Sequence, residues 1–174
     1  DMKAKKFIQE GSTFTEGDLK ISADKILLTG TGTQADNINI TGKLDNQTNI
    51  YTKGNVYVGN DTVNTGKIIS EKGIIISGNL NTSNIIYGKD IINISGNLFN
   101  TSDMQSEGSI ITGLNATNKG RILAGNVLQI NGTTVNEGTL YGKNGINLKE
   151  LTNSGNIQST EDITAQHVLN TAKI

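Results

Sequence analysis

Residues 85–98 read IIYGKDIINISGNL, and residues 67–80, which lie 18 positions earlier, read KIISEKGIIISGNL. In this alignment Gly78-Asn79-Leu80 falls on Gly96-Asn97-Leu98, and Ile74 and Ile76 fall on Ile92 and Ile94. Three more stretches match without gaps at an offset of 54, which is three times 18: residues 36–46 with 90–100, 54–68 with 108–122, and 87–94 with 141–148. A repeat of fixed period indicates stacked structural units.

Apolar and polar residues alternate inside each unit, as in Ile92-Asn93-Ile94, Val56-Tyr57-Val58 and Leu128-Gln129-Ile130. A period of two is typical of a strand with one buried face and one solvated face. Steps of Asn and Gly separate these segments: Asn64-Thr65-Gly66, Asn118-Lys119-Gly120 and Asn136-Glu137-Gly138. We expect these steps to be turns, because both residue types tolerate positive φ.

Units of this length can bury equivalent faces by stacking along an axis. The sequence therefore predicts an all-β, right-handed parallel β-helix with about 18 residues per turn. About nine turns at ~4.8 Å each give a rod of roughly 40–45 Å. The missing proline fits strands that donate amide hydrogens to both neighbours. A β-sandwich would instead give irregular strand spacing, and a left-handed hexapeptide helix would need an aliphatic residue at every sixth position.

Register and boundaries follow from the same repeat. Residue 104 matches residue 157 at an offset of 53, so one turn is a residue shorter. We expect residues 1–16 to form an irregular lead-in or atypical turn and residues 17–174 to form the repeat segment. The chain begins with Asp and reads as a piece of a longer protein. The expected inward stacks are Ile40/Ile94/Leu148 and Val56/Ile110.

Composition excludes several kinds of site. The 174 residues include no cysteine, so disulfides, cysteine-bound metals and thiol nucleophiles are excluded. The 15 basic and 16 acidic residues give no electrostatic reason to expect nucleic acid. No apolar run approaches the ~18 residues that would cross a membrane as a helix, so we expect no membrane insertion.

The unit from Gly88 to Asn100 resembles the haemagglutinin repeats of the filamentous haemagglutinin family, and the resemblance extends from about Gly17 to Thr171. These are large two-partner-secreted exoproteins of Gram-negative bacteria, including adhesins and the stalks of contact-dependent inhibition toxins. The resemblance implies a right-handed β-helix shaft on an extracellular protein. The family's secretion domain carries a proline-containing NPNG motif, and this chain has no proline, so the resemblance is to a repeat segment.

Candidate chemical groups are few, and we expect no catalytic residue, no cofactor and no metal. A glycosidase needs two carboxylates ~5–9.5 Å apart. Asp36 and Asp90 repeat three turns apart, which is roughly 14 Å, and Glu107 and Glu161 share that offset.

Glu161-Asp162 is the sole adjacent acidic pair, and His167 is the sole histidine. Gly30-Thr31-Gly32 lacks the context of a phosphate-binding loop, so we interpret it as a turn.

Surface recognition remains open in two forms. The four tyrosines, Tyr51, Tyr57, Tyr87 and Tyr141, could be exposed aromatics on a sugar-binding face. Alternatively, Tyr87 and Tyr141, which share a repeat position, are turn residues packed against Gly88 and Gly142. Some adhesins of the resembled family are glycosylated at Asn-x-Ser/Thr sequons. In this chain such sequons occur at Asn39, Asn46, Asn60, Asn81, Asn93, Asn100, Asn115 and Asn131.

The sequence thus favours a structural function, as the shaft of a secreted or cell-surface bacterial exoprotein that displays adhesive or toxic regions. Expected partners, both reached through the parent protein, are a host receptor or glycan and an outer-membrane transporter that binds a domain outside this chain. A segment that itself binds host glycan or protein is the alternative. A polysaccharide-degrading β-helix enzyme is the third hypothesis.

Overall fold

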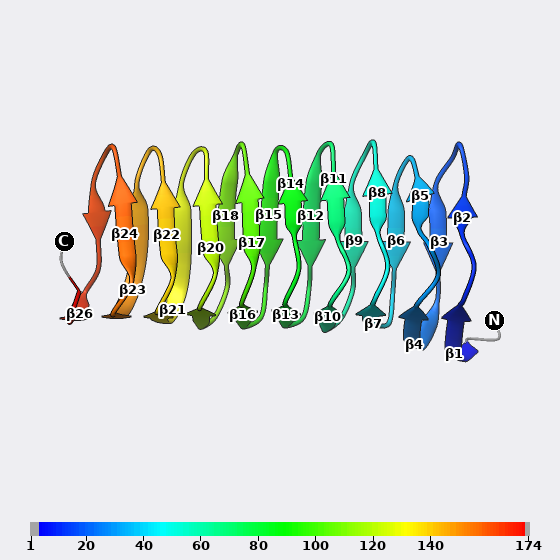
Figure 1. Ribbon diagram of the computed structural model, residues 1–174, viewed down its shortest axis with the longest axis horizontal. Coiled ribbons are helices and arrows are strands. Elements are labelled where there is room, and N and C mark those ends of the chain that lie inside the picture. Colours follow the sequence, from blue (N-terminus) through cyan, green and yellow to red (C-terminus); the bar gives the residue numbers. More distant parts are fainter. Residues whose placement is uncertain (1–3, 173–174) are drawn as a thin grey trace.

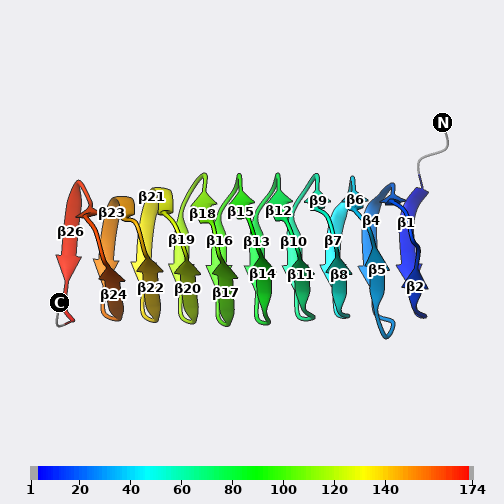
Figure 2. The same cartoon turned by 90° about the horizontal axis from the view of Figure 1, so that it is seen from above.

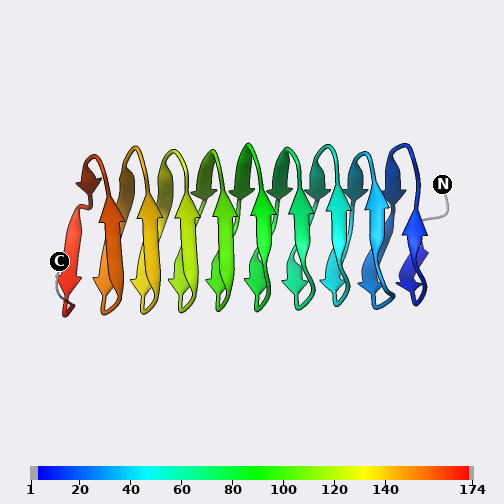
Figure 3. The same ribbon diagram turned by 45° about the horizontal axis from the view of Figure 1, so that its top comes forward.

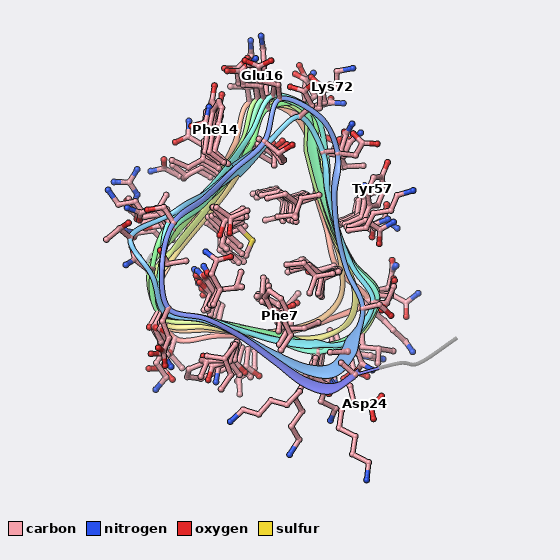
Figure 4. The ribbon with its side chains drawn as sticks, turned by 90° about the vertical axis from the view of Figure 1, so that its right-hand side faces the viewer. Phe7, Phe14, Glu16, Asp24, Tyr57 and Lys72 are labelled. Carbon is pink, nitrogen blue, oxygen red and sulfur yellow. The ribbon has the colours of Figure 1, made fainter. Side chains whose placement is uncertain are left out.

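The alternating segments form short strands, each paired in parallel with the equivalent strands of neighbouring turns (Figure 1). The computed structural model describes residues 4–172, and every strand pairing in this range is parallel. Seen from the N-terminal end, Phe7, Phe14, Glu16 and Asp24 follow one another clockwise as the chain recedes (Figure 4). The winding is therefore right-handed, and the predicted fold class is confirmed.

Each turn contributes one strand to each of three faces, which enclose a triangular interior (Figure 4). The first face contains the second halves of β21 and β23 together with β1 (Ala4–Gln9), β4 (Ala23–Leu28), β7 (Lys43–Asn46), β10 (Thr62–Asn64), β13 (Leu80–Thr82), β16 (Leu98–Asn100), β19 (Ala116–Asn118) and β26 (His167–Asn170).

The second face is a separate sheet, formed in the described chain by β2 (Thr13–Phe14), β5 (Thr33–Ala35), β8 (Ile50–Thr52), β11 (Ile68–Ser70), β14 (Ile86–Gly88), β17 (Asp103–Ser106), β20 (Arg121–Ala124), β22 (Thr139–Gly142) and β24 (Asn156–Ser159). The third face comprises β3 (Leu19–Ile21), β6 (Ile38–Ile40), β9 (Val56–Val58), β12 (Gly73–Ile76), β15 (Ile91–Ile94), β18 (Ser109–Thr112), the first halves of β21 (Leu128–Asn136) and β23 (Ile146–Asn153), and β25 (Ile163–Thr164). The first strand, β1 (blue), and the last strand, β26 (red), lie at opposite ends of the rod (Figures 1 and 3).

The register reproduces the repeat. Thr62 pairs with Leu80, Leu80 with Leu98, and Leu98 with Ala116, each pair separated by one full repeat. The offset is one position shorter where β22 meets β24, because Leu140 pairs with Ile157. Met104 reaches Ile157 through Ile122 and Leu140, so two full repeats and one short turn account for the expected offset of 53.

The first turn has longer offsets. Ala4 pairs with Ala23, one position beyond the repeat, and Thr13 pairs with Thr33, two positions beyond it. Both β1 and β2 lie inside the range 1–16, and β3 starts at Leu19. The expected ranges 1–16 and 17–174 extend beyond the described residues by three and two positions.

The interior is filled by aliphatic rows that run along the rod. Val56 and Ile110 belong to one row, and Ile40, Ile94 and Leu148 belong to another; all five are buried, so both expected stacks are confirmed. Burying a side chain of this size stabilises the fold by about 1.5–3 kcal/mol relative to leaving it exposed. The core is therefore a continuous column with a nearly constant cross-section.

The structure corrects the expected position of Asn64, Asn118 and Asn136. These residues are the last residues of strands and are fully buried, so they are not turn residues. Most of the asparagines in this row donate a side-chain hydrogen bond to the side chain one turn further on. We call the row the amide ladder, and its members are Asn46, Asn64, Thr82, Asn100, Asn118, Asn136, Asn153 and Asn170.

The structural reason for glycine at the corners also differs from the expected tolerance of positive φ. Among residues 4–172, positive φ occurs at Gly145 alone, so the Asn and Gly steps do not depend on that conformation. A Cβ on Gly66 would collide with the carbonyl group of Thr48 in the preceding turn, and a Cβ on Gly120 would collide with that of Ser102. Glycine is required because successive corners approach closely, not because the backbone is left-handed.

Candidate functional site

The second face presents a row of outward side chains at the middle of its strands. Residues on either side of this row point into the core, because side chains alternate along a strand. The row, which we call the aromatic column, contains Phe14, Gln34, Tyr51, Ile69, Tyr87, Gln105, Leu123, Tyr141 and Gln158. Neighbouring members lie one turn apart, so rings, aliphatic chains and glutamine amides share a single stripe along the rod.

Two tyrosines of the aromatic column are held by carboxylates of the next turn. The Tyr87 hydroxyl donates to Glu107 Oε1 at 2.7 Å, and the Tyr51 hydroxyl donates in the same way to Glu71. In each pair the hydrogen bond to the carboxylate raises the pKa of the tyrosine, and burial and the negative charge add to the effect. The phenols therefore remain neutral donors, with their hydroxyls directed at fixed acceptors.

Charges of alternating sign follow the aromatic column. Lys53, Glu71, Lys89 and Glu107 each come directly after a strand of the second face, in four successive turns. Lys53 also forms an ion pair with Asp36, with 3.7 Å between Nζ and Oδ1. The stripe beside the rings is therefore close to electrically neutral.

The candidate tyrosines divide between two faces. Tyr51, Tyr87 and Tyr141 share the aromatic column, whereas Tyr57 lies on the third face and is 41% exposed. The interpretation of Tyr87 and Tyr141 as turn residues is wrong, because both lie within strands and point outward. Sequence reasoning missed Phe14, Ile69 and Leu123 as members of the same row. The repeat could have placed Ile69 and Leu123, which lie one full repeat from Tyr51 and Tyr141, but it could not have placed Phe14, which is out of register with it.

No known protein family, curated protein or solved structure matches this chain.

The carboxylate candidates remain apart. Asp36 pairs with Lys53, and its backbone carbonyl accepts from Gly54, while the Asp90 backbone amide donates to the carbonyl of Lys72. This ladder keeps the two aspartates three turns from each other, roughly 14 Å along the axis. Glu107 and Glu161 are both exposed; Glu107 accepts a hydrogen bond from Tyr87, and Glu161 lies near the C-terminal end. Neither pair has the spacing that glycoside hydrolysis requires.

The other candidate groups are scattered. Asp162 is exposed beside Glu161, and His167 begins β26, opposite Glu150. Within residues 4–172 no three His, Cys, Asp or Glu side chains gather as they would around a metal ion. The same residues include no helix that is long and apolar enough to span a membrane. The segment Gly30-Thr31-Gly32 lies between β4 and β5, where the winding turns a corner.

The sequons differ in accessibility. Asn46 and Asn100 are fully buried in the amide ladder, so the folded chain does not offer them for modification. The remaining six are exposed or partly exposed: Asn39, Asn60, Asn81, Asn93, Asn115 and Asn131. Of the groups considered, the aromatic column is the one that the fold assembles into a continuous surface.

Proposed function

We propose that this chain is the structural shaft of a large secreted or surface-exposed bacterial exoprotein of the haemagglutinin-repeat type. It holds adhesive or toxic regions of that protein away from the cell. The observation that carries the proposal is the regular register of the solenoid. The central turns stack at the full repeat, and the pairings depart from it by one or two positions only in the first turns and near the C-terminal end.

Mechanical stiffness follows from three parallel systems of contacts. The backbone of each interior turn is hydrogen bonded to the turns before and after it. The aliphatic rows fill the interior, and the amide ladder adds side-chain hydrogen bonds along the axis. Bending the rod would stretch contacts of all three systems along its convex side, so the structure suits a spacer better than a hinge.

The resemblance to haemagglutinin repeats supports an extracellular location and an outer-membrane transporter as a partner of the parent protein. Protease digestion of intact cells that express the parent protein tests the location. Release of fragments containing this segment supports surface exposure, and complete protection of the segment contradicts it.

An in-frame deletion tests the spacer function. Removing residues 62–115 from the parent protein deletes three turns and joins Asp61 to Ala116, which occupies the register position of Thr62. We expect a rod that is shorter by roughly 14 Å, with adhesion or toxin delivery reduced in proportion to its reach. Removing residues 62–106 deletes two and a half turns, and we expect that variant to misfold.

A second candidate function is direct adhesion, and the aromatic column supports it. If the shortened rod folds and reaches the surface but keeps full activity, reach is not the function of these turns. Loss of cell binding by the isolated chain when the aromatic column is altered would instead favour direct adhesion.

A further inference from the structure

Phe14 is the most exposed large apolar side chain in residues 4–172, with 67% of its surface accessible. It lies in β2, the terminal strand of the second face, and points outward at the end of the aromatic column (Figure 4). Leaving a phenyl ring this exposed gives the fold little stability, because burial is the source of hydrophobic stabilisation. Within the described residues, the strand that carries the ring pairs with β5 alone, and the ring itself faces solvent.

Two hollows flank the ring, and both include Phe14 and Gln34 in their walls. One has a volume of about 320 Å³ and is bordered by Glu16, Asp36 and Lys53. The other has a volume of about 270 Å³ and is bordered by Thr31, Asn49 and Tyr51. A flat apolar surface thus lies between two sets of hydrogen-bonding groups. We call Phe14 and Gln34 with these two hollows the Phe14 platform.

A local irregularity of the winding shapes the platform. The pairing of Thr13 with Thr33 is two positions longer than the repeat, whereas the pairing of Thr33 with Ile50 is one position shorter. The corner 29–32 therefore has one residue more than the equivalent corner 47–49, and its loop extends beyond the others (Figure 2). Thr31 on this loop hydrogen bonds to Ser12 in the preceding turn, which fixes the wall of one hollow.

We propose that the Phe14 platform binds an uncharged, extended β-linked oligosaccharide. A pyranose has an apolar face of C–H groups, which can lie on an aromatic ring, and an edge of hydroxyl groups. Gln34 and Asn49 each offer amide donors and acceptors, and Glu16 and Asp36 accept from hydroxyls. Recognition by one apolar surface and a few placed polar groups is typical of small-ligand sites.

Charge and area favour this ligand over the alternatives. The platform carries two carboxylates and one lysine, and that lysine is already paired with Asp36. A sulfated or sialylated glycan would meet net negative charge there. A protein partner would require a wider apolar centre, whereas Phe14 is surrounded by polar side chains.

The aromatic column gives the ligand its direction. Phe14, Gln34 and Tyr51 occupy three successive turns, so the two rings lie about 10 Å apart along the axis. One sugar of an extended β-linked chain advances about as far as one turn of the solenoid. A sugar on Phe14 therefore places the next one over Gln34 and the third one near Tyr51.

This inference rests on direct adhesion, the second candidate function, and is independent of the spacer function. Isothermal titration of the full chain with cellohexaose and with chitohexaose tests it. We expect at least one of them to bind, and Phe14→Ala to weaken that binding at least tenfold. Phe14→Tyr keeps an aromatic ring and should restore it. Phe99→Ala is the matched control, since Phe99 is an exposed ring on the first face.

Several results would overturn the site: no binding of either oligosaccharide, equal binding by the Phe14→Ala and wild-type chains, or preferential binding of a heparin hexasaccharide. Melting curves of each variant show whether the fold is intact, and we expect them to overlay because Phe14 lies outside the core. A parallel assay of wild-type binding to cells distinguishes failure of the proposed oligosaccharide site from failure of direct adhesion as a function. Cell binding without oligosaccharide binding rejects this site but retains direct adhesion, and absence of both rejects both.

Discussion

The side-chain amide of Asn100 donates a 2.9 Å hydrogen bond to the side-chain carbonyl oxygen of Asn118, one turn further along the rod. Asn118 repeats the arrangement with Asn136 at 2.8 Å. All three side chains are fully buried, and their amides also donate to backbone carbonyls at the following corner. Each of these three buried amides is thus satisfied by its counterpart in an adjacent turn and by the following corner, so their burial depends on the repeat.

Replacing Asn118 with Ala should lower the free energy of unfolding by about 2–3 kcal/mol, because buried partners lose their hydrogen bonds. The affected groups include Asn136 Oδ1 and the backbone carbonyls of Gly120 and Thr139. Urea denaturation measures the loss. Asn118→Thr is the matched variant and should cost less, since Thr82 occupies the ladder position and accepts from Asn64 at 3.1 Å. A larger loss for Thr than for Ala would contradict the role of the ladder.

Thr112 interrupts the aliphatic row that contains Ile94 and Ile130. Its hydroxyl is buried and has no hydrogen-bond partner among residues 4–172. Replacing it with Val keeps the shape and removes an unsatisfied polar group, which should stabilise the fold by about 1–2 kcal/mol. The same change at Thr117, on the outward side of β19, should stay within about 0.5 kcal/mol. Thermal denaturation of both variants tests this prediction. An unchanged or lower melting temperature for Thr112→Val would show that the unsatisfied hydroxyl does not destabilise the fold.

Two glycines separate the effect of close stacking from that of backbone freedom. Gly66→Ala places a methyl group against the carbonyl of Thr48, and we expect a loss of about 1–3 kcal/mol. A Cβ on Gly11 meets no atom within 4 Å, so Gly11→Ala should be neutral or stabilising by up to about 1 kcal/mol. Urea denaturation of both variants provides the comparison, and equal effects would show that stacking does not determine the choice of glycine at position 66.

The solenoid and its register could be predicted because both follow from local sequence patterns. Period-two alternation marks the strands, and the repeat states which residues lie above one another, as for Ile40 and Ile94. Even the short turn between Met104 and Ile157 was visible as an offset of 53.

The amide ladder and the reason for the glycines could not be predicted in the same way. Asn118 is buried because its partner one turn away satisfies it, and Gly66 is needed because a neighbouring corner approaches it. Both are contacts between turns. The aromatic column could be predicted only in part. The repeat places Ile69 beside Tyr51, but Phe14 lies two positions out of register with Gln34, so contacts between the first turns decide its place.

Replacing Ile94 with Asp should destabilise the rod strongly, because it places a carboxylate in a fully buried aliphatic row without a partner. We expect the free energy of unfolding to fall by more than about 4 kcal/mol and the stacking of the neighbouring turns on the substituted turn to be disrupted. The control is Asn93→Asp on the same strand, where the side chain points outward and is partly exposed. Circular dichroism melting curves compare the two, and a similar midpoint for both would show that the assigned register of β15 is wrong.

Asp61 makes the stability of the first face depend on pH. The backbone amide of Asn79 donates to Asp61 Oδ1 at 2.9 Å, and Lys43 lies 3.3 Å from Oδ2. These contacts lower the pKa of Asp61, chiefly through the backbone hydrogen bond, against the opposing effect of burial. Because the folded pKa is lowered, this contribution is fully present above the unfolded value of about 3.9 and is lost as pH falls through the folded value.

Asp61→Asn should remove that dependence, because the amide oxygen still accepts from Asn79 but does not titrate in this range. We expect the wild type to be the more stable of the two at pH 7, by less than about 1 kcal/mol for so exposed a site. The difference should shrink between pH 5 and pH 2, as followed by urea denaturation at each pH. Lys43→Met is the control: it removes the ion pair but keeps the leading hydrogen bond, so its pH profile should resemble that of the wild type. If Lys43→Met abolishes the dependence as completely as Asp61→Asn does, the ion pair and not the Asn79 amide controls the titration.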